Sequence, residues 1–182
     1  MNNNWQQDKY IKACRFAAQA HNNGQVVPGT ELPYLLHLSL VSMEIIAAIG
    51  TDKRYDADLA MQCAWLHDTI EDTETTYDDI VDNFGVAVAD GVQALTKDMS
   101  LPKSDQMADS LRRIKDQPKE VWAVKMADRI TNLQPPPSHW SKEKIAKYRI
   151  EALLIHDELK EGNEVLADRL YKKAEAYKAF MQ

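Results

Sequence analysis

The sequence contains few of the residues and segments that mark zinc-binding, secreted or membrane proteins. Only two of its 182 residues are cysteines, Cys14 and Cys63, and neither lies in a CxxC or Cys/His spacing typical of a zinc site. Residues 1–10 lack the apolar core of a signal peptide. The most apolar stretch, residues 35–50, contains His37 and Glu44 and is too short to span a bilayer. We therefore expect a reduced, cytoplasmic protein without a membrane segment.

Basic residues are scarce relative to acidic ones. The chain has 22 Lys plus Arg against 28 Asp plus Glu, which gives a formal net charge of −6. A broad nucleic-acid surface needs a basic face, so this balance argues against a nucleic-acid partner while leaving room for a small basic pocket. With 45% hydrophobic residues over 182 positions, the chain is long enough to bury the core of one domain spanning residues 1–182.

Alternating strand patterns are nearly absent, whereas apolar residues recur at steps of three or four over most of the chain. Thr75 and Thr76, followed by Asp78 and Asp79, predict an N-cap with an acidic first turn. The pattern predicts an all-α fold, a bundle of about eight to ten helices over residues 10–21, 36–47, 57–72, 75–85, 88–95, 105–116, 119–133, 141–160 and 163–181.

Two segments interrupt this helical pattern. Residues 97–104 are polar and contain Pro102, which predicts a surface loop. Residues 135–137 are three consecutive prolines, through which no helix can pass. They are short enough to favour a rigid turn between two packed helices, with a linker between domains as the alternative.

The clearest candidate for chemistry is the motif LHDTIED at residues 66–72, at the end of the most apolar predicted helix. Ionisable side chains in such a place are costly unless they pair or bind something. In a continuous helix His67 and Glu71 would share one face, with Asp68 and Asp72 beside them. A satisfied core pair or a solvated helix end would explain His67 and Asp68 alone. Three carboxylates around one imidazole instead favour a bound cation.

Two other predicted helices offer partners for this motif. His37 follows Pro33 at the start of an apolar helix, and Asp128 lies within the apolar stretch of residues 121–130. Taken singly, His37 reads as a packed core histidine and Asp128 as a partner of Arg129. Taken with His67 and Asp68, they form a mixed nitrogen and oxygen ligand set, which suits Mn, Fe or Zn better than calcium.

The order His37, His67-Asp68, Asp128 resembles the H…HD…D signature of HD-domain metal-dependent phosphohydrolases. The resemblance is closest to alarmone hydrolases of the Rel/SpoT type, in particular the stand-alone small alarmone hydrolases that include the metazoan SpoT homologue. It covers residues 10–160, with the predicted helix 163–181 packed on that domain. The strings that carry it are FAAQAH at 16–21, PYLLH at 33–37, LHDTIEDT at 66–73, FG at 84–85, LTK at 95–97 and KMADRITNL at 125–133.

This resemblance implies a single HD domain that depends on one Mn²⁺ ion per chain, or another divalent transition metal, and removes the 3′-pyrophosphate from ppGpp and pppGpp. It places His37, His67, Asp68 and Asp128 on the metal ligands. It also places two acids, Glu71 and Asp72, on the pair that positions and activates the attacking water, although both would also suit an acidic helix start.

The resemblance further implies a small-molecule nucleotide as the partner of this chain. Asn132 lies one helical turn after Asp128 and matches a position that contacts the nucleotide. Lys144 and Tyr148 match positions that reach phosphate and ribose, and an ordinary solvated helix face is their alternative. Positive charge near the metal or the pocket is expected from three lysines: Lys125, Lys97 and Lys103.

The sequence departs from the family where an Arg-Lys pair normally meets the base. Here Val26, Val27 and Pro28 follow Gln25, and valine cannot imitate a guanidinium. The leading substrate is ppGpp, and the alternatives are an adenine alarmone such as ppApp and another nucleotide such as NADPH or a nucleotide monophosphate. A phosphohydrolase that releases orthophosphate and a non-catalytic nucleotide-binding HD module are further alternatives, and the oligomeric state stays open.

Overall fold

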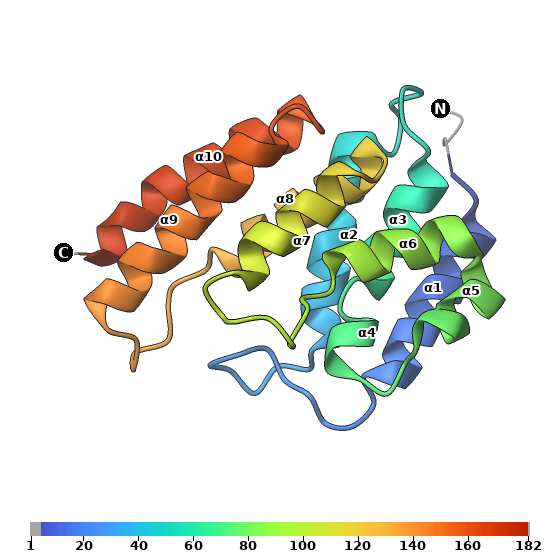
Figure 1. The fold of residues 1–182 in the computed structure, drawn as a ribbon, viewed down its shortest axis with the longest axis horizontal. Coiled ribbons are helices and arrows are strands. Elements are labelled where there is room, and N and C mark those ends of the chain that lie inside the picture. Colours follow the sequence, from blue (N-terminus) through green and yellow to red (C-terminus); the bar gives the residue numbers. More distant parts are fainter. Residues whose placement is uncertain (1–4, 182) are drawn as a thin grey trace.

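The all-α prediction is confirmed. A computed structural model describes residues 5–181, and in that range the chain forms ten α-helices, one 3-10 helix and no strand (Figure 1). The elements are α1 (Gln7–Ala20), α2 (Leu35–Ile49), α3 (Ala57–Leu66), α4 (Thr69–Asp72), α5 (Tyr77–Phe84), α6 (Val86–Leu95), α7 (Gln106–Lys115), α8 (Lys119–Asn132), α9 (Lys142–Leu159), α10 (Glu164–Ala176) and the 3-10 helix η1 (Tyr177–Met181).

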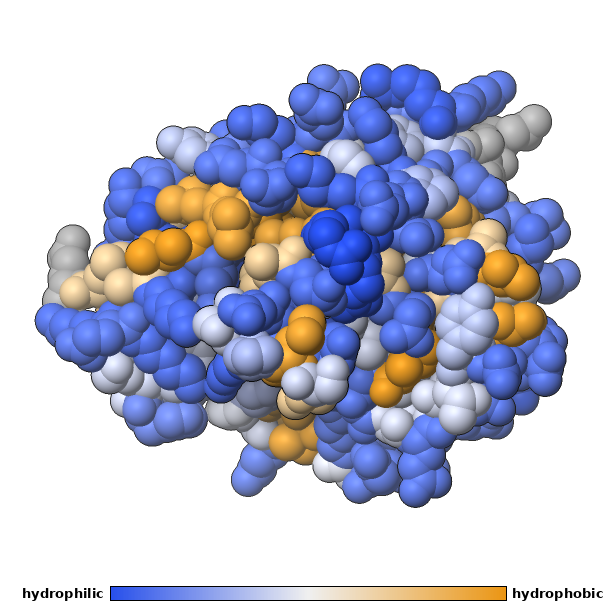
Figure 2. Space-filling view, viewed as in Figure 1, coloured by the Kyte–Doolittle hydropathy of each residue, from blue (hydrophilic) through white to orange (hydrophobic). Residues whose placement is uncertain are grey.

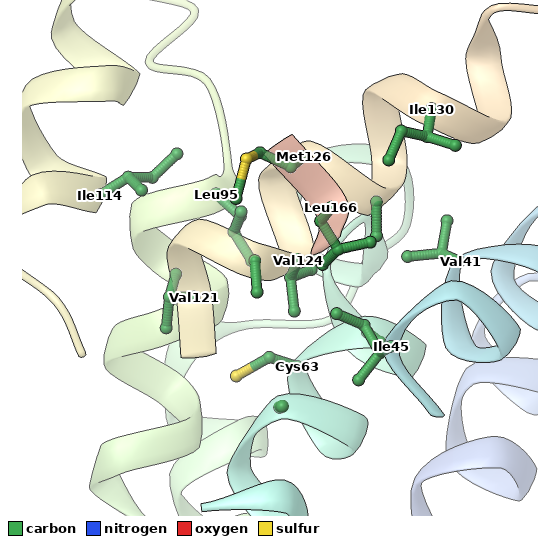
Figure 3. Close-up of a cluster of buried hydrophobic side chains, with 14 of the residues drawn as sticks. Val41, Ile45, Cys63, Leu95, Ile114, Val121, Val124, Met126, Ile130 and Leu166 are labelled. Carbon is green, nitrogen blue, oxygen red and sulfur yellow. The ribbon is translucent and has the colours of Figure 1, made fainter. Parts of the chain in front are cut away.

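Helix α8 lies at the centre of the bundle. It packs against α2 and α3 on one side and against α9 and α10 on the other, while α1 covers α3. Figure 3 shows the core where these helices meet, with Val41 and Ile45 of α2, Cys63 of α3 and Val124 of α8 pointing toward one another. All four of these side chains are fully buried. The core thereby fixes the relative positions of α2, α3 and α8, the helices that carry or precede His37, His67, Asp68 and Asp128.

Side-chain caps determine where several helices begin. The predicted cap of α5 is confirmed as a capping box, in which Thr76 accepts from the backbone of Asp79 and the Asp79 carboxylate accepts from the backbone of Thr76. Asp56 caps α3, Ser141 caps α9 and Asn163 caps α10 in the same one-sided way.

The prediction of one continuous helix over residues 57–72 is wrong. Helix α3 ends at Leu66, and α4 begins at Thr69 after a turn at His67 and Asp68. The Thr69 hydroxyl donates to the Leu66 carbonyl over 2.7 Å, and the His67 Nδ1 lies 2.9 Å from the Ala64 carbonyl. Side chains thus take carbonyls that a continuing helix would offer to its own backbone. The predicted helix 163–181 is likewise divided, because its last turn tightens into η1.

The loops that follow α1, α6 and α8 gather at one edge of the bundle, together with α4 (Figure 1). The loop after α1 contains a bridge between Val26 and Pro33, and Gly29 with a φ of 80° packs against Pro137 in the loop after α8. A Cβ atom at Gly29 would lie 2.9 Å from the Pro137 Cγ, so the approach of the two loops requires glycine there. The three prolines therefore form part of a packed corner between α8 and α9.

The surface is mostly hydrophilic in the view of Figure 2, apart from an apolar strip over the side of α9 that faces α7. Leu111 and Leu154 line a shallow groove between these two helices. Among the described residues, no helix combines the length and the apolar character that crossing a membrane requires.

We expect the contact between α3 and α6 to tolerate no added methyl group. A Cβ atom at Gly91 would lie 2.8 Å from the Cys63 Sγ and 3.0 Å from the Val121 Cγ2, and all three residues are buried. Overpacking of this kind costs about 1–3 kcal/mol, so Gly91→Ala should lower the free energy of unfolding by that amount in urea denaturation.

The matched control is Gln93→Ala, at an exposed position of the same helix, which should change stability by less than about 0.5 kcal/mol. Because the clash is with the Cys63 sulfur, Gly91→Ala should cost at least about 1 kcal/mol less in a Cys63→Ala background. Equal costs in the two backgrounds would contradict the close contact.

Candidate metal centre

Three helices bring two imidazoles and two carboxylates together beneath the loop-rich edge. His37 comes from the first turn of α2, His67 and Asp68 from the turn after α3, and Asp128 from the last turn of α8. The Nε2 atoms of His37 and His67 lie 3.3 Å apart. Asp68 Oδ2 is 2.9 Å from His67 Nε2, and Asp128 Oδ1 is 3.5 Å from His37 Nε2. The four residues that sequence analysis singled out therefore converge on one point.

Both histidines are held with Nε2 toward this point. His67 Nδ1 lies 2.9 Å from the Ala64 carbonyl, so it donates there and leaves the Nε2 lone pair facing inward. The Thr131 hydroxyl donates to the Asp128 carbonyl, and its oxygen lies 3.4 Å from His37 Nδ1 as an acceptor. Hydrogen bonds of this kind behind each ring are typical of histidines that ligate a metal.

The ligand atoms of His37, His67 and Asp128 all lie within 4.8 Å of one another, and Asp68 joins them through His67. Two inward imidazole nitrogens and two carboxylate oxygens in a buried site carry negative charge that a divalent cation would balance. Two nitrogen and two oxygen ligands suit a divalent transition metal. The donor set of this chain thus fits the ion that HD domains bind.

The histidines and carboxylates of the centre shift one another's pKa values. Burial would lower the pKa of His37, but hydrogen bonds and charge from Asp128 and Asp68 outweigh it and raise that pKa to about 9. The pKa of His67 is raised in the same way, against burial, by the carboxylate of Asp68. Burial would raise the pKa of the Asp68 carboxyl, yet the neighbouring His67 and His37 hold it well below its usual value. The centre therefore holds protons where a metal would bind.

The Asp128 carboxylate is oriented by neighbours on its own helix. Asn132 Nδ2 donates to Oδ1 over 2.6 Å, and Lys125 Nζ donates to Oδ2 over 3.3 Å. Burial opposes ionisation of Asp128, but Lys125 and His37 hold its pKa below the usual value. The alternative pairing of Asp128 with Arg129 does not occur. The Arg129 guanidinium instead lies 4.3 Å from the Tyr148 ring.

Glu71 and Asp72 lie beside the centre but make different contacts. Both oxygens of Glu71 are occupied, one by Lys97 Nζ at 2.6 Å and the other by the Lys97 backbone N–H at 2.9 Å. Asp72 receives a single hydrogen bond, from Gln25 Nε2 to Oδ2 at 2.9 Å. Burial and the charges of Asp68 and Glu71 raise the pKa of Asp72. Of the two acids, Asp72 therefore keeps an oxygen that accepts no hydrogen bond from the residues that the structure describes.

Two cavities adjoin at the centre. The first, of about 340 Å³, we call the polar cavity. It contains the acids of the site and five cations, and its charged lining is Asp68, Glu71, Asp72, Lys97, Lys103, Lys125, Asp128, Arg129, Lys147 and Glu151. Among the described residues, two of these cations, Lys103 and Lys147, form no ion pair with an acid of the chain. The polar cavity is thus equipped for an anionic group.

The second, of about 610 Å³, we call the apolar cavity, and His37, Asn132 and Tyr148 are part of its wall. Apart from His37, no ionisable imidazole, lysine, arginine or acid lines it. Its apolar wall comes from the loops after α1 and α8, the start of α2 and η1, and consists of Val27, Pro28, Leu32, Leu36, Leu40, Pro135, Pro136, Pro137, Trp140 and Tyr177. A flat, weakly polar group would fit this second space.

The structure does not bring every predicted substrate-binding residue into these cavities. Asn132, Lys125 and Tyr148 line the polar cavity. Lys144 lines neither cavity, because its ammonium group lies 4.1 Å from the centre of the Trp140 ring. Lys147, one helical turn further, takes a place in the polar cavity, and sequence analysis did not single it out.

Sequence analysis also missed the residues that support the ligands. The Tyr34 hydroxyl donates a short hydrogen bond to Asp68, Thr131 lies behind His37, and Gln25 bonds to Asp72. Tyr34 and Thr131 lie three residues from His37 and Asp128, which is the spacing of one helical turn and offered a signal. Gln25 lies in a loop, where no periodicity pointed to its partner.

Several known proteins resemble this chain in sequence and in fold. The HD domain family matches residues 13–162. The guanosine-3′,5′-bis(diphosphate) 3′-pyrophosphohydrolase MESH1 of Mus musculus is 30% identical over 165 residues, which cover 88% of this chain and 89% of that protein. MESH1 of Homo sapiens is 31% identical over 143 residues, covering 76% and 77%. The solved structure of a metazoan ortholog of SpoT has the same fold, with a TM-score of 0.80 and 24% identity over 97% of this chain and 98% of its own.

We expect a divalent ion to displace protons from the centre. His37, with a pKa of about 9, carries a proton at pH 7 in the metal-free protein, and the ion and the proton compete for Nε2. Calorimetric titration with Mn²⁺ or Zn²⁺ in buffers of different ionisation enthalpy should show release of at least one proton per ion. The affinity should rise about tenfold per pH unit from pH 6.5 toward 9.

The affinity should increase with pH because the pKa of His37 is raised. Protonation of His37 stabilises the metal-free fold fully below pH 6.5, and this stabilisation is lost as the pH rises through 9, where metal binding no longer competes with a proton. His37→Gln should reduce the number of protons released. An affinity that is independent of pH between 6.5 and 8 would contradict the arrangement.

Proposed function

The chain belongs to the HD-domain family, and from that membership we propose that it is a metal-dependent hydrolase that removes the 3′-pyrophosphate from guanosine 3′,5′-bis(diphosphate)-type alarmones. The relatives named as such pyrophosphohydrolases support this activity. The observation that carries the proposal is the position of the His/Asp centre between the polar cavity, which has five cations besides its acids, and the apolar cavity. A nucleotide with phosphates at the centre and a flat base beyond it has this division of charge.

We propose His37, His67, Asp68 and Asp128 as the ligands of one Mn²⁺ ion, because two imidazoles with two carboxylates suit that ion. When bound, such an ion supplies a water of lowered pKa and stabilises charge on the phosphorus centre. Cys14 and Cys63 are free thiols, which is consistent with our proposal that the enzyme works in the reducing cytoplasm.

The contacts of Asp72 and Glu71 suggest different roles for these two acids. Asp72 has an oxygen without a hydrogen-bond donor and a raised pKa, which favours it as the group that takes the proton of the attacking water. Glu71 is bound through both oxygens to Lys97, so we assign it the role of holding that lysine at the polar cavity. The water oxygen then bonds to phosphorus as the bond between phosphorus and the ribose 3′-oxygen breaks. The proton that Asp72 took from the water passes to the 3′-oxygen, so that a nucleotide with a 3′-hydroxyl and pyrophosphate leave.

The apolar cavity favours a second candidate substrate, the adenine alarmone. Three of its neutral polar groups are already engaged, since Thr131 donates to the Asp128 carbonyl, Gln134 to the Thr131 carbonyl and Asn132 to the Asp128 carboxylate. Among the described residues, no charged side chain other than His37 lines this cavity, in line with valine at positions 26 and 27. A largely apolar wall separates similar ligands only weakly.

We expect the Mn²⁺-loaded protein to release pyrophosphate from both ppGpp and ppApp, with kcat/KM values within about tenfold of each other. Chelation by EDTA should abolish the release, and so should His67→Ala and Asp68→Ala. Ion-exchange chromatography of the products after incubation with ppGpp, ppApp and NADPH checks this. Release of orthophosphate in place of pyrophosphate would support the other class of phosphohydrolase. No turnover of either alarmone would contradict the proposed substrate.

A matched pair of lysines tests the orientation of the substrate. Lys147 lines the polar cavity and Lys144 does not, although both are exposed lysines of α9. Lys147→Ala should raise KM about fivefold, corresponding to about 1 kcal/mol for one charge-assisted phosphate contact, while Lys144→Ala should change it by less than twofold. Steady-state kinetics with ppGpp decides between them, and a larger effect at Lys144 would reverse the assignment.

A further inference from the structure

The loop after α1 contacts the acid that the proposed function uses as proton acceptor. Gln25 Nε2 donates to Asp72 Oδ2 over 2.9 Å, and Gln25 Oε1 lies 2.6 Å from His21 Nδ1. We propose that Gln25 is a positioning residue that orients the Asp72 carboxylate, and that His21 in turn orients Gln25. This inference rests on the proposed function, because it assigns a role within the same site.

Each hydrogen bond determines the orientation of the next group, from Asp72 to Gln25 and from Gln25 to His21. An ionised carboxylate only accepts hydrogen bonds, so Asp72 requires the amide nitrogen of Gln25 to face it. The amide oxygen of Gln25 must then face His21, and it requires a proton on Nδ1. In a neutral imidazole this leaves Nε2 without a proton, and His21 Nε2 is indeed buried with no hydrogen-bond donor near it. The directions of all three groups are therefore consistent with one another.

His21 is held firmly enough to orient Gln25. It is only 7% exposed, it caps the end of α1 through its backbone N–H to the Ala17 carbonyl, and its ring lies 5.1 Å from the Tyr34 ring. Tyr34 donates its hydroxyl hydrogen to Asp68. The same pair of tilted rings thus supports the proposed metal ligand Asp68 directly and Asp72 through Gln25.

The backbone of Gln25 is held as firmly as its side chain. Its N–H is 3.2 Å from the Asn23 Oδ1, and its carbonyl accepts from the Tyr34 N–H over 3.0 Å. The neighbouring bridge between Val26 and Pro33 closes the loop. The side-chain amide of Gln25 therefore extends to Asp72 from a backbone that hydrogen bonds hold in place.

Asp72 needs such support more than the ligands do. It ends α4, a helix of only four residues, and its side chain faces an open cavity. Asp68 and Glu71 on the same short segment repel its charge. With Oδ2 bound by Gln25, the other oxygen is directed to the position of the water. Without Gln25 the carboxylate would rotate, and its productive orientation would be only partly populated.

The test is Gln25→Leu, which removes the amide and keeps most of the volume. In the Mn²⁺-loaded enzyme kcat should fall about 10- to 100-fold, the usual effect of losing an outer hydrogen bond to a site residue. KM for ppGpp and the Kd for Mn²⁺ should stay within twofold, because Gln25 touches no proposed ligand. Gln93→Leu, at an exposed position of α6, is the matched control and should leave kcat unchanged.

A second measurement needs no turnover. Nitrogen-15 shifts of the histidine rings should show His21 as the Nδ1–H tautomer in the wild type and as a mixture of tautomers in Gln25→Leu. Carboxyl carbon-13 titration should show a higher pKa for Asp72 in Gln25→Leu, because a donor to its charged form is lost.

The outcomes separate the two proposals. If the wild type hydrolyses neither alarmone, the proposed function fails, while the tautomer and the titration still test the contact with Gln25. If the wild type is active and Gln25→Leu keeps its kcat, or loses activity only through a weaker Kd for Mn²⁺, the positioning role is overturned. His21→Phe should reproduce the loss of kcat, and full activity in that variant would remove His21 from the role.

Discussion

The structure depends on one close contact between charged groups. The Nε2 atoms of His37 and His67 lie 3.3 Å apart, beside the carboxylates of Asp68 and Asp128. His67 is 3% exposed, and uncompensated charge in such a place is costly. The bundle must therefore hold α2, α3 and α8 so that their ends meet there, and many of the largest fully buried side chains belong to these three helices. Core packing and site geometry are in this sense one constraint, because a shift of α8 against α2 would separate Asp128 from His37.

The helical architecture could be predicted because its signals are local. Apolar residues at steps of three and four gave the helices, and the threonine-aspartate pattern gave the capping box of α5. The break between α3 and α4 could not be found this way. It depends on the Thr69 hydroxyl and the His67 ring taking backbone carbonyls, and periodicity does not record that competition. The break lies within the HD motif, where the turn directs both His67 and Asp68 to the same point.

The same distinction applies to the site. The four proposed ligands were visible in the sequence because ionisable residues in apolar helices are conspicuous, and their order resembled a known family. Gln25 was not visible, because it reaches Asp72 from a loop in another part of the chain. The spacing of Tyr34 from His37 placed it near the site but did not identify Asp68 as its partner. Lys147 illustrates a finer difference. Residues 144 and 147 are one turn apart on α9, and only the packing of Lys144 on Trp140 determines which of them borders the polar cavity.

The distribution of charge explains how an acidic protein can bind a polyanion. The net charge of −6 is spread over the molecule, whereas five cations are gathered at the polar cavity. Lys97 and Lys125 neutralise acids of the site itself, and Lys103 and Lys147 remain for an incoming anion. The screened repulsion from distant acids falls off within about 10 Å. At the polar cavity the five cations balance five carboxylates, so a bound divalent ion would make the site positive. Binding strength would then come from the phosphate end of a ligand. The apolar cavity would add mainly contact area, and selectivity for the base would be weak for that physical reason.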